Sequence, residues 1–174
     1  MYLFKKDKDR LKKLKIFERS IGYGFRNKAL LNQALTHKSY ANEKSLERSS
    51  DNERLEFLGD SVLGLIMSHI LYNECQGEDE GVLTRYKSQL VSGETLGRIA
   101  KELEIGEYIL LGRGEEASGG RKHASNLMCA MEAIIGAIFL DGGLRAAHIF
   151  INRAFRPEMQ LVKEGRGSKD YKSI

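Results

Sequence analysis

Three acidic residues stand at a spacing that places them on one face of a helix. Glu53, Glu56 and Asp60 occupy positions i, i+3 and i+7, and at about 100° per residue they fall within an arc of about 60°. The sequence around them, LEFLGDSVLGLI, is strongly apolar, so part of this acidic face is expected in or beside the core. A buried carboxylate is costly unless a cation or a metal ion compensates its charge.

A further acid, Glu132, interrupts the apolar run LMCAMEAIIGAIFL, and no basic residue lies near it in the sequence. Small residues would let this helix pack closely on the first one: Ala130, Ala133 and Gly136 here, and Gly59 there. The carboxylates of the two helices could then converge. A cluster of carboxylate oxygens suits Mg²⁺ or Mn²⁺. Such ions hydrolyse phosphodiesters by activating water and neutralising the leaving oxygen.

Arginines offer a different explanation of the same acids. Glu56 and Asp60 could form ion pairs, for example with Arg54 or Arg85, whose only effect is to hold helices together. Spacing alone does not decide between this structural role and a metal site.

The elements that must position these acids are predicted to be helices. The chain has a single proline, Pro157, and its apolar residues recur mostly at spacings of three and four, so we expect an all-α fold. Ser50 followed by Glu53 has the form of a capping box, which predicts a helix from near Asp51. The predicted helices cover roughly residues 11–21, 30–35, 51–72, 83–91, 92–103, 127–140 and 145–155, with Ser92 as a cap, Gly142 and Gly143 as a stop, and a glycine-rich loop at 112–122.

The overall composition indicates one soluble domain. The 174 residues are 41% hydrophobic and 30% charged, which is typical of globular proteins. No run of about 18 apolar residues predicts a membrane span, and the charged N-terminus MYLFKKDKDR does not resemble a signal peptide. We therefore expect a cytoplasmic protein without a membrane partner. Cys75 and Cys129 are too far apart in sequence to suggest a disulfide framework or a zinc site.

The net charge of +4 is weak evidence for nucleic-acid binding because of where the charge lies. Residues 1–15 hold seven Lys or Arg against two Asp, so this arm carries +5 and the rest of the chain −1. A lysine-rich terminal helix is usually a solvated face. The mildly acidic body is what a carboxylate-lined metal site would produce.

Four segments, in order, are similar to those of the bacterial ribonuclease III family. Residues 51–63, DNERLEFLGDSVL, resemble the family's signature throughout their length. The other three are LTHKSYANE at 35–43, DEGVLTRYKSQLV at 79–91 and MEAIIGAIFLDGG at 131–143. The resemblance spans about residues 15 to 174.

This resemblance implies a helical endonuclease-domain fold and metal-dependent cleavage of double-stranded RNA, with Mg²⁺ or Mn²⁺ as the cofactor. Carried over by position, the family's metal ligands fall on Glu56, Asp60 and Glu132, and the residues usually named catalytic on Asp60 and Glu132. Further acids that the family places around the same valley match Glu53, Glu80 and Glu115. An exposed glutamate in a polar loop is more often simply solvated.

Family behaviour also implies an assembly. The expected homodimer has two active sites, each of which cuts one RNA strand to leave 5′-phosphate ends and a short 3′ overhang. Phe57 is expected to pack into the partner subunit, and the alternative is a core contact within its own subunit.

One position departs from the family pattern. Three residues before Glu132, on the same helix face, the family usually has a metal-binding aspartate, and this chain has Cys129. A thiolate is a soft ligand poorly matched to Mg²⁺, and a buried thiol tends to stay protonated. We keep Cys129 in the predicted metal set and expect a weaker site. The rival interpretation is decay to a catalytically impaired RNA-binding or ribosome-associated scaffold of the same fold.

The second departure is length. We expect residues 1–162 to be the catalytic domain and residues 163–174 to be a linker towards an absent double-stranded-RNA-binding domain. Double-stranded RNA is recognised by shape, through 2′-hydroxyl and phosphate contacts, so the missing domain should cost affinity more than sequence choice.

Overall fold

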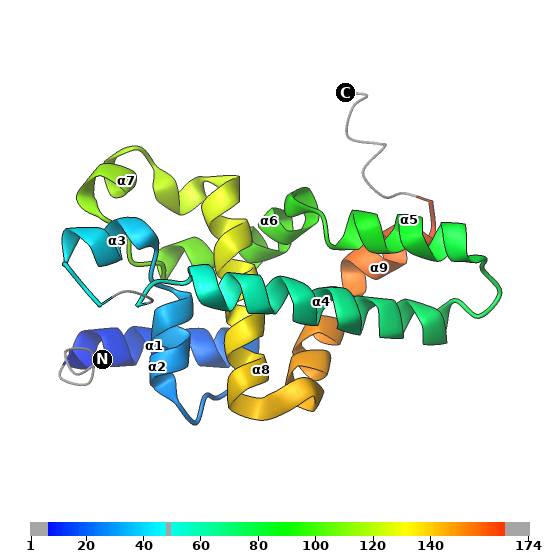
Figure 1. Cartoon of the computed structure of the whole chain (residues 1–174), viewed down its shortest axis with the longest axis horizontal. Coiled ribbons are helices and arrows are strands. Elements are labelled where there is room, and N and C mark those ends of the chain that lie inside the picture. Colours follow the sequence, from blue (N-terminus) through cyan, green and yellow to red (C-terminus); the bar gives the residue numbers. More distant parts are fainter. Residues whose placement is uncertain (1–6, 48–49, 166–174) are drawn as a thin grey trace.

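The computed structural model describes residues 7–47 and 50–165, which fold into packed helices (Figure 1). Their bounds are α1 Lys8–Ile21, α2 Lys28–Ala34, α3 Lys38–Glu43, α4 Glu53–Glu74, α5 Glu80–Leu90, α6 Gly93–Glu102, η2 Ile105–Glu107, α7 Arg113–Ala117, η3 Gly120–Lys122, α8 Ala124–Ala154 and α9 Arg156–Lys163. No β-strand forms within the described ranges, where Thr36 and Leu110 make an isolated bridge. The predicted all-α fold is confirmed.

The two longest helices, α4 and α8, cross each other and make the most extensive contact between elements (Figure 1). Glycines allow the close approach. A Cβ on Gly59 would collide with the carbonyl oxygen of Glu132, and a Cβ on Gly136 would collide with the carbonyl oxygen of Leu55. This confirms the prediction that the helix of Glu132 packs on the helix of Glu56.

The hydrophobic core surrounds this crossing. Leu63 and Met67 of α4 and Ile134 and Ile135 of α8 are fully buried, and burial of each such side chain contributes about 1.5–3 kcal/mol. By length and composition alone, α4 and α8 could each cross a membrane. In the fold they bury their apolar faces in the common core, as the central helices of a globular domain do.

A kink divides α8 where the sequence predicts a stop. Gly143 has a φ of 75° and a ψ of −175°, while the residues on both sides of it are helical. Glycine adopts this left-handed φ without steric cost. The predicted end of the helix at Gly142 and Gly143 is therefore realised as a change of direction.

Asp141, just before this kink, fastens α8 to the loop that leads into α2. Its carboxylate accepts hydrogen bonds from the backbone N–H of Arg26 at 2.9 Å and of Asn27 at 2.8 Å, and from the hydroxyl of Tyr23 at 2.8 Å. Burial alone would raise the pKa of Asp141, but these hydrogen bonds outweigh it and hold the pKa below its usual value.

Two predicted helix boundaries agree with the structure in detail. Gly22 ends α1 in the left-handed conformation with a φ of 57°. Ser92 caps α6, since its hydroxyl oxygen accepts the backbone N–H of Thr95 at 3.2 Å.

The predicted capping box at Ser50 is wrong. Helix α4 begins at Glu53 with Asn52 as its N-cap, and no side chain caps it from that position. The carboxylate of Asp51 instead accepts the N–H of Glu53 at 3.2 Å. Asp51, and not Ser50, therefore provides the side-chain acceptor at the start of the helix.

The glycine-rich segment 112–122 is more ordered than a simple loop. It contains α7 and η3. Arg121 holds it in place by donating to Glu116 at 2.6 Å and to the carbonyl oxygens of Gly106 at 2.8 Å and Ile109 at 3.0 Å. The guanidinium of Arg121 is half-buried, and its carbonyl partners lie far from it in the sequence. Local composition does not predict such contacts.

The two ends of the chain differ in part from the prediction. Arg10 of the basic arm is buried, not solvated, and donates to Asn32 at 2.8 Å and to the carbonyl oxygen of Tyr108 at 2.7 Å. Helix α9 was not predicted, and its first turn carries Pro157. Residues 1–6 of the arm and 166–174 of the predicted linker lie outside the described residues.

Candidate active site

The crossing of α4 and α8 brings together three of the predicted acids. Glu56 and Asp60 lie in the first two turns of α4, and Glu132 lies on α8 where its backbone meets Gly59. The charges of Asp60 and Glu56 both act on Glu132. Carboxylates that are far apart in the sequence therefore face one region of the molecule.

Glu132 is the buried member of this group, with 8% of its surface exposed. Burial raises the pKa of Glu132 to about 7, and the charges of Asp60 and Glu56 add to the effect. Its charged form is thus disfavoured at neutral pH as long as nothing compensates the charge. A bound cation would reverse that preference.

The carboxylates of this group form no ion pair with a basic side chain in the part of the chain that the structure describes. Among the described residues, no ion pair includes Glu56, Asp60 or Glu132. The alternative in which Arg54 or Arg85 pairs with them to hold helices together is therefore wrong.

A lysine that the prediction did not single out stands at the edge of the group. Lys38, the first residue of α3, pairs with Glu53 at 3.2 Å, and both side chains are more than half exposed. Such a pair contributes little to stability. The charge of Lys38 also acts on Cys129 and Glu56. Glu53 therefore already has a cationic partner at the edge of the group, whereas Glu56 forms no ion pair.

Cys129 lies one turn before Glu132 on α8 and is partly buried. Burial, a hydrogen bond to Glu56 and the charges of Glu56 and Glu132 raise the pKa of the thiol to about 12. The thiol is therefore neutral at physiological pH, as a proton donor beside carboxylates and not as an anionic ligand.

The acids lie near one another, but they are not close enough to coordinate a metal ion together. Within residues 7–47 and 50–165, no three His, Cys, Asp or Glu side chains lie close enough to hold a metal ion. Like charges repel when no counterion lies between them. The donor set itself fits a hard divalent cation, because its oxygens are carboxylates and Glu132 is buried without a cationic partner. The thiol of Cys129 does not fit such an ion.

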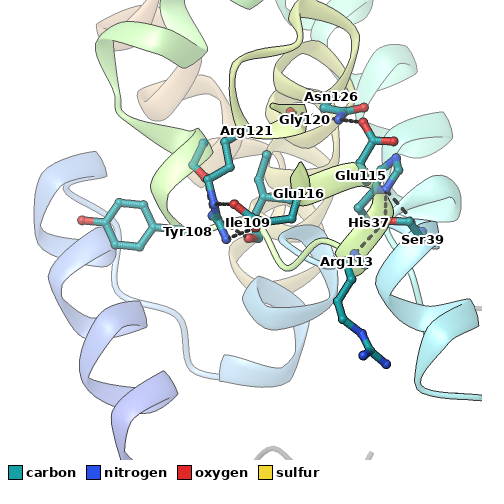
Figure 2. A network of polar contacts seen from close by, with 12 residues as sticks. His37, Ser39, Tyr108, Ile109, Arg113, Glu115, Glu116, Gly120, Arg121 and Asn126 are labelled. Carbon is teal, nitrogen blue, oxygen red and sulfur yellow. Dashed lines mark hydrogen bonds and ion pairs between the residues drawn. The ribbon is translucent and has the colours of Figure 1, made fainter. Parts of the chain in front are cut away.

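Glu115 belongs to a separate polar network, drawn in Figure 2. Its carboxylate accepts a hydrogen bond from the amide of Asn126 at 2.8 Å and lies 3.2 Å from Nδ1 of His123. The buried amide of Asn126 also donates to the carbonyl oxygen of Gly120 at 3.0 Å. The bond from Asn126 is the main cause that holds the pKa of Glu115 below its usual value. Glu115 thus anchors the 112–122 segment to α8.

His37 is close enough to Glu115 of this network and to Glu53 of α4 for the charges of both to act on it. Burial lowers its pKa, and the charges of Glu115 and Glu53 oppose that effect. Its Nδ1 lies 2.8 Å from the hydroxyl of Ser39 (Figure 2). Sequence reasoning missed both His37 and Asn126. The available signal was that Asn126 is a polar residue at the start of the apolar run of α8.

Glu80 lies away from the group in this single chain. It begins α5, which follows the C-terminal end of α4, whereas Glu56 lies near the N-terminal end (Figure 1). A helix of that length spans about 30 Å. Glu80 accepts a hydrogen bond from Thr84 at 2.9 Å.

Phe57 follows Glu56 on α4 and has 79% of its surface exposed. The alternative in which Phe57 makes a core contact within its own subunit is therefore wrong.

Comparison with known proteins decides what this arrangement belongs to. Residues 27–159 match the family described as Ribonuclease-III-like. Ribonuclease 3 of Syntrophotalea carbinolica is 45% identical over 158 residues, which cover 91% of this chain and 68% of that protein. The ribonuclease 3 of Dehalococcoides mccartyi is 47% identical over 156 residues, covering 90% and 66%. The chain belongs to the ribonuclease III family. It is thus an endoribonuclease of this type, whose members depend on divalent metal ions.

Solved structures of ribonuclease III nuclease domains share the fold. One from Campylobacter jejuni, described for flexibility in a region involved in dimer formation, matches with a TM-score of 0.76 and 39% identity over 83% of this chain and 96% of that one. A second, also from Campylobacter jejuni, gives a TM-score of 0.75 and 37% identity over 88% and 96%. The chain therefore corresponds to nearly all of a ribonuclease III nuclease domain, and to about two thirds of the curated relatives.

Proposed function

We propose that this ribonuclease III chain hydrolyses phosphodiester bonds of double-stranded RNA at the crossing of α4 and α8, with Asp60 and Glu132 as catalytic residues and Glu56 as a further metal ligand. One observation carries the assignment. Glu132 is buried beside two carboxylates, and no cation of the described residues pairs with it. A buried carboxylate without a cationic partner lowers the stability of the fold. Its presence here therefore favours a role in binding a cation.

The proposed cofactor is Mg²⁺, with Mn²⁺ able to replace it, because the carboxylate oxygens available here are hard ligands. When bound, the metal would supply activation of water and neutralisation of the leaving oxygen. The carboxylates of Glu56, Asp60 and Glu132 would hold it from two helices. The buried position of Glu132 would limit competition from solvent for its oxygens.

The proposed substrate and assembly follow from family membership. Two subunits would each cut one strand of the duplex and leave 5′-phosphate ends and short 3′ overhangs, and the exposed Phe57 would pack into the partner subunit. Double-stranded RNA would be read through its shape and backbone. We infer a cytoplasmic site of action, where RNA processing takes place in bacteria.

Glu132→Gln tests the proposed site directly. The substitution keeps the size of the side chain and removes the charge, so cleavage of a long RNA duplex with Mg²⁺ should fall by about 10²-fold or more, the scale of losing one charge contact in a transition state. Duplex binding should remain. Because burial already disfavours the charged form of Glu132, the variant should melt at the wild-type temperature or above it.

The control is Glu102→Gln, which removes one negative charge from an exposed position on α6 and should leave cleavage unchanged. Wild-type cleavage by a folded Glu132→Gln protein would refute the assignment. A wild-type chain that binds the duplex but does not cut it with Mg²⁺ or Mn²⁺ would favour the scaffold instead, the alternative that Cys129 suggests and that relatives named ribonuclease 3 make less favoured.

A further inference from the structure

Helix α1 presents a row of exposed cationic side chains, which we call the basic stripe. The stripe consists of Lys8, Lys12, Lys15 and Arg19. These positions are i, i+4, i+7 and i+11, and at about 100° per residue they fall within an arc of about 60°. The buried side chains Leu14, Phe17 and Ile21 lie on the opposite side of the helix. The core therefore fixes which face of α1 the stripe occupies.

Little negative charge neutralises the basic stripe. In the part of the chain that the structure describes, its cations other than Lys12 form no ion pair. Lys12 pairs with Asp9 at 3.9 Å, and both side chains are largely exposed, so this pair contributes little. Glu18 of the same helix is buried and accepts a hydrogen bond from Lys28 at 2.6 Å. The positive charges of the stripe are thus available to a partner.

A hollow of about 320 Å³ opens at the C-terminal end of the stripe, with Lys15, Arg19 and Gly22 in its lining. The negative end of the helix dipole would oppose an anion there. Arg153 of α8 counters this effect, because its guanidinium lies against Gly22 and donates to the carbonyl oxygen of Ile21. The hollow therefore has room for a phosphate group beside cations.

A row of this kind fits a regular polyanion better than it fits a protein partner. The stripe rises about 16 Å along the helix, and a nucleic-acid duplex presents a phosphate every few ångströms along each strand. Lysine is depleted at the centre of protein interfaces, whereas Lys and Arg make many of the contacts to nucleic-acid phosphates. Such contacts do not read base edges, so they do not depend on the base sequence.

We propose that the basic stripe of α1 binds the phosphate backbone of double-stranded RNA, as a contact surface separate from the carboxylates at the crossing of α4 and α8. The choice of double-stranded RNA as the polyanion rests on the proposed function. No residue of α1 belongs to the acidic group. The stripe therefore adds affinity and takes no part in the chemistry, so it changes how much RNA is bound and not how fast bound RNA is cut.

The salt dependence of RNA binding tests the stripe. A labelled long RNA duplex is titrated at several salt concentrations, with EDTA present to prevent cleavage. Lys12→Gln combined with Lys15→Gln removes two phosphate contacts, so the slope of log K against log salt should become shallower by about 1.4–1.8, at about 0.7–0.9 per phosphate. The affinity at low salt should fall at least about tenfold. In Mg²⁺-dependent cleavage, KM should rise while kcat stays at the wild-type value.

The matched control is Lys13→Gln combined with Lys101→Gln. It removes the same charge from exposed positions, and Lys13 lies on α1 about 100° outside the arc of the stripe. This control should keep the wild-type slope and affinity. Both double variants should melt at the wild-type temperature, because the substituted side chains are exposed.

A wild-type salt slope for the stripe variant, or an equal change in the control, would overturn the proposal. The same holds if the stripe variant loses binding to polyglutamate but keeps wild-type binding to the duplex, because the stripe then serves an acidic polypeptide. If the proposal fails while cleavage depends on Glu132, the proposed function stands without it. If the wild-type chain binds the duplex through the stripe but does not cleave it, the stripe stands and the proposed function fails.

Discussion

At the scale of single residues, position 129 determines how well the proposed site suits Mg²⁺. Cys129→Asp should lower the Mg²⁺ concentration needed for half-maximal cleavage, by about tenfold if the new ligand adds about 1.4 kcal/mol. Asp and Glu132 stand at i and i+3, so their oxygens reach the same surface. In a Mg²⁺ titration, unchanged metal dependence of a folded Cys129→Asp protein would remove residue 129 from the site.

Cys129→Asp should also lower the stability of the fold when metal is absent, although it should strengthen Mg²⁺ binding. A carboxylate at position 129 adds a third charge beside Glu56 and Glu132, where burial already raises the pKa of Glu132. The melting temperature without Mg²⁺ should therefore fall below that of the wild type, and it should rise more steeply as Mg²⁺ is added, because binding stabilises the folded state.

The sequence points to the acids of the proposed site more clearly than to their neighbours. Helical spacing places Glu56 and Asp60 on one face, and the isolated charge of Glu132 in an apolar run marks it as unusual. Lys38 and His37 could not be found in this way. They lie at the start of α3, which tertiary packing brings close to the acids. The spacing of residues along the chain does not predict which helix ends lie side by side.

At the scale of helices, the decisive feature is how closely α4 and α8 approach. The sequence predicts the contact because Gly59 and Gly136 stand within apolar helices, where glycine is otherwise unfavourable. The boundaries at Gly22 and Ser92 were predictable for a related reason, since local backbone chemistry sets them. Helix α9 and the inner structure of 112–122 were not, because they depend on long-range partners. Glu158 of α9 pairs with Arg98, and Arg121 of the 112–122 segment donates to the carbonyl oxygen of Gly106.

Asp141→Asn tests the fastening of α8 to the loop before α2. Its hydrogen bonds lower the pKa of Asp141 in the folded state below the unfolded value of 3.8. The charged carboxylate therefore stabilises the fold above that pH, and the contribution is lost as the pH falls through the folded pKa. The variant should lose about 1–3 kcal/mol of unfolding free energy at pH 7 and show a smaller loss than the wild type on acidification.

Urea unfolding at pH 7 and near pH 3 measures both effects. Asp9→Asn is the control, since the Asp9 side chain is 91% exposed and its only ion pair, with Lys12, is 3.9 Å long in the described structure. Its unfolding free energy should change by less than about 0.5 kcal/mol. Equal acid sensitivity of wild type and Asp141→Asn would show that other carboxylates dominate.

At the scale of the whole molecule, one surface carries more apolar side chains than a monomer needs. Phe57, Leu65 and Tyr72 of α4 are 79%, 60% and 71% exposed, and at about 100° per residue they lie within an arc of about 80°. The sequence showed a helix that is apolar on nearly every side. It could not show which side the core leaves open, because that depends on where α8 and α5 pack.

Phe57→Asp tests whether this face joins two subunits. The wild-type chain should run as a species of about twice 19.6 kDa in size-exclusion chromatography with light scattering, whereas the variant should run as a monomer at micromolar concentration. Since Phe57 makes little contact within its own chain, the substitution should leave the monomer folded. A charge buried against a partner's apolar surface would cost several kcal/mol.

The control for this prediction is Ile16→Asp, which places the same charge at an apolar side chain on α1 that is 57% exposed. It should remain a dimer. In the cleavage assay, Phe57→Asp should stop producing paired cuts across a duplex, because two sites must be held at a fixed distance to cut both strands. If Phe57→Asp stays dimeric at micromolar concentration, the two subunits meet through another surface. The distance between the two active sites would then not depend on this face of α4.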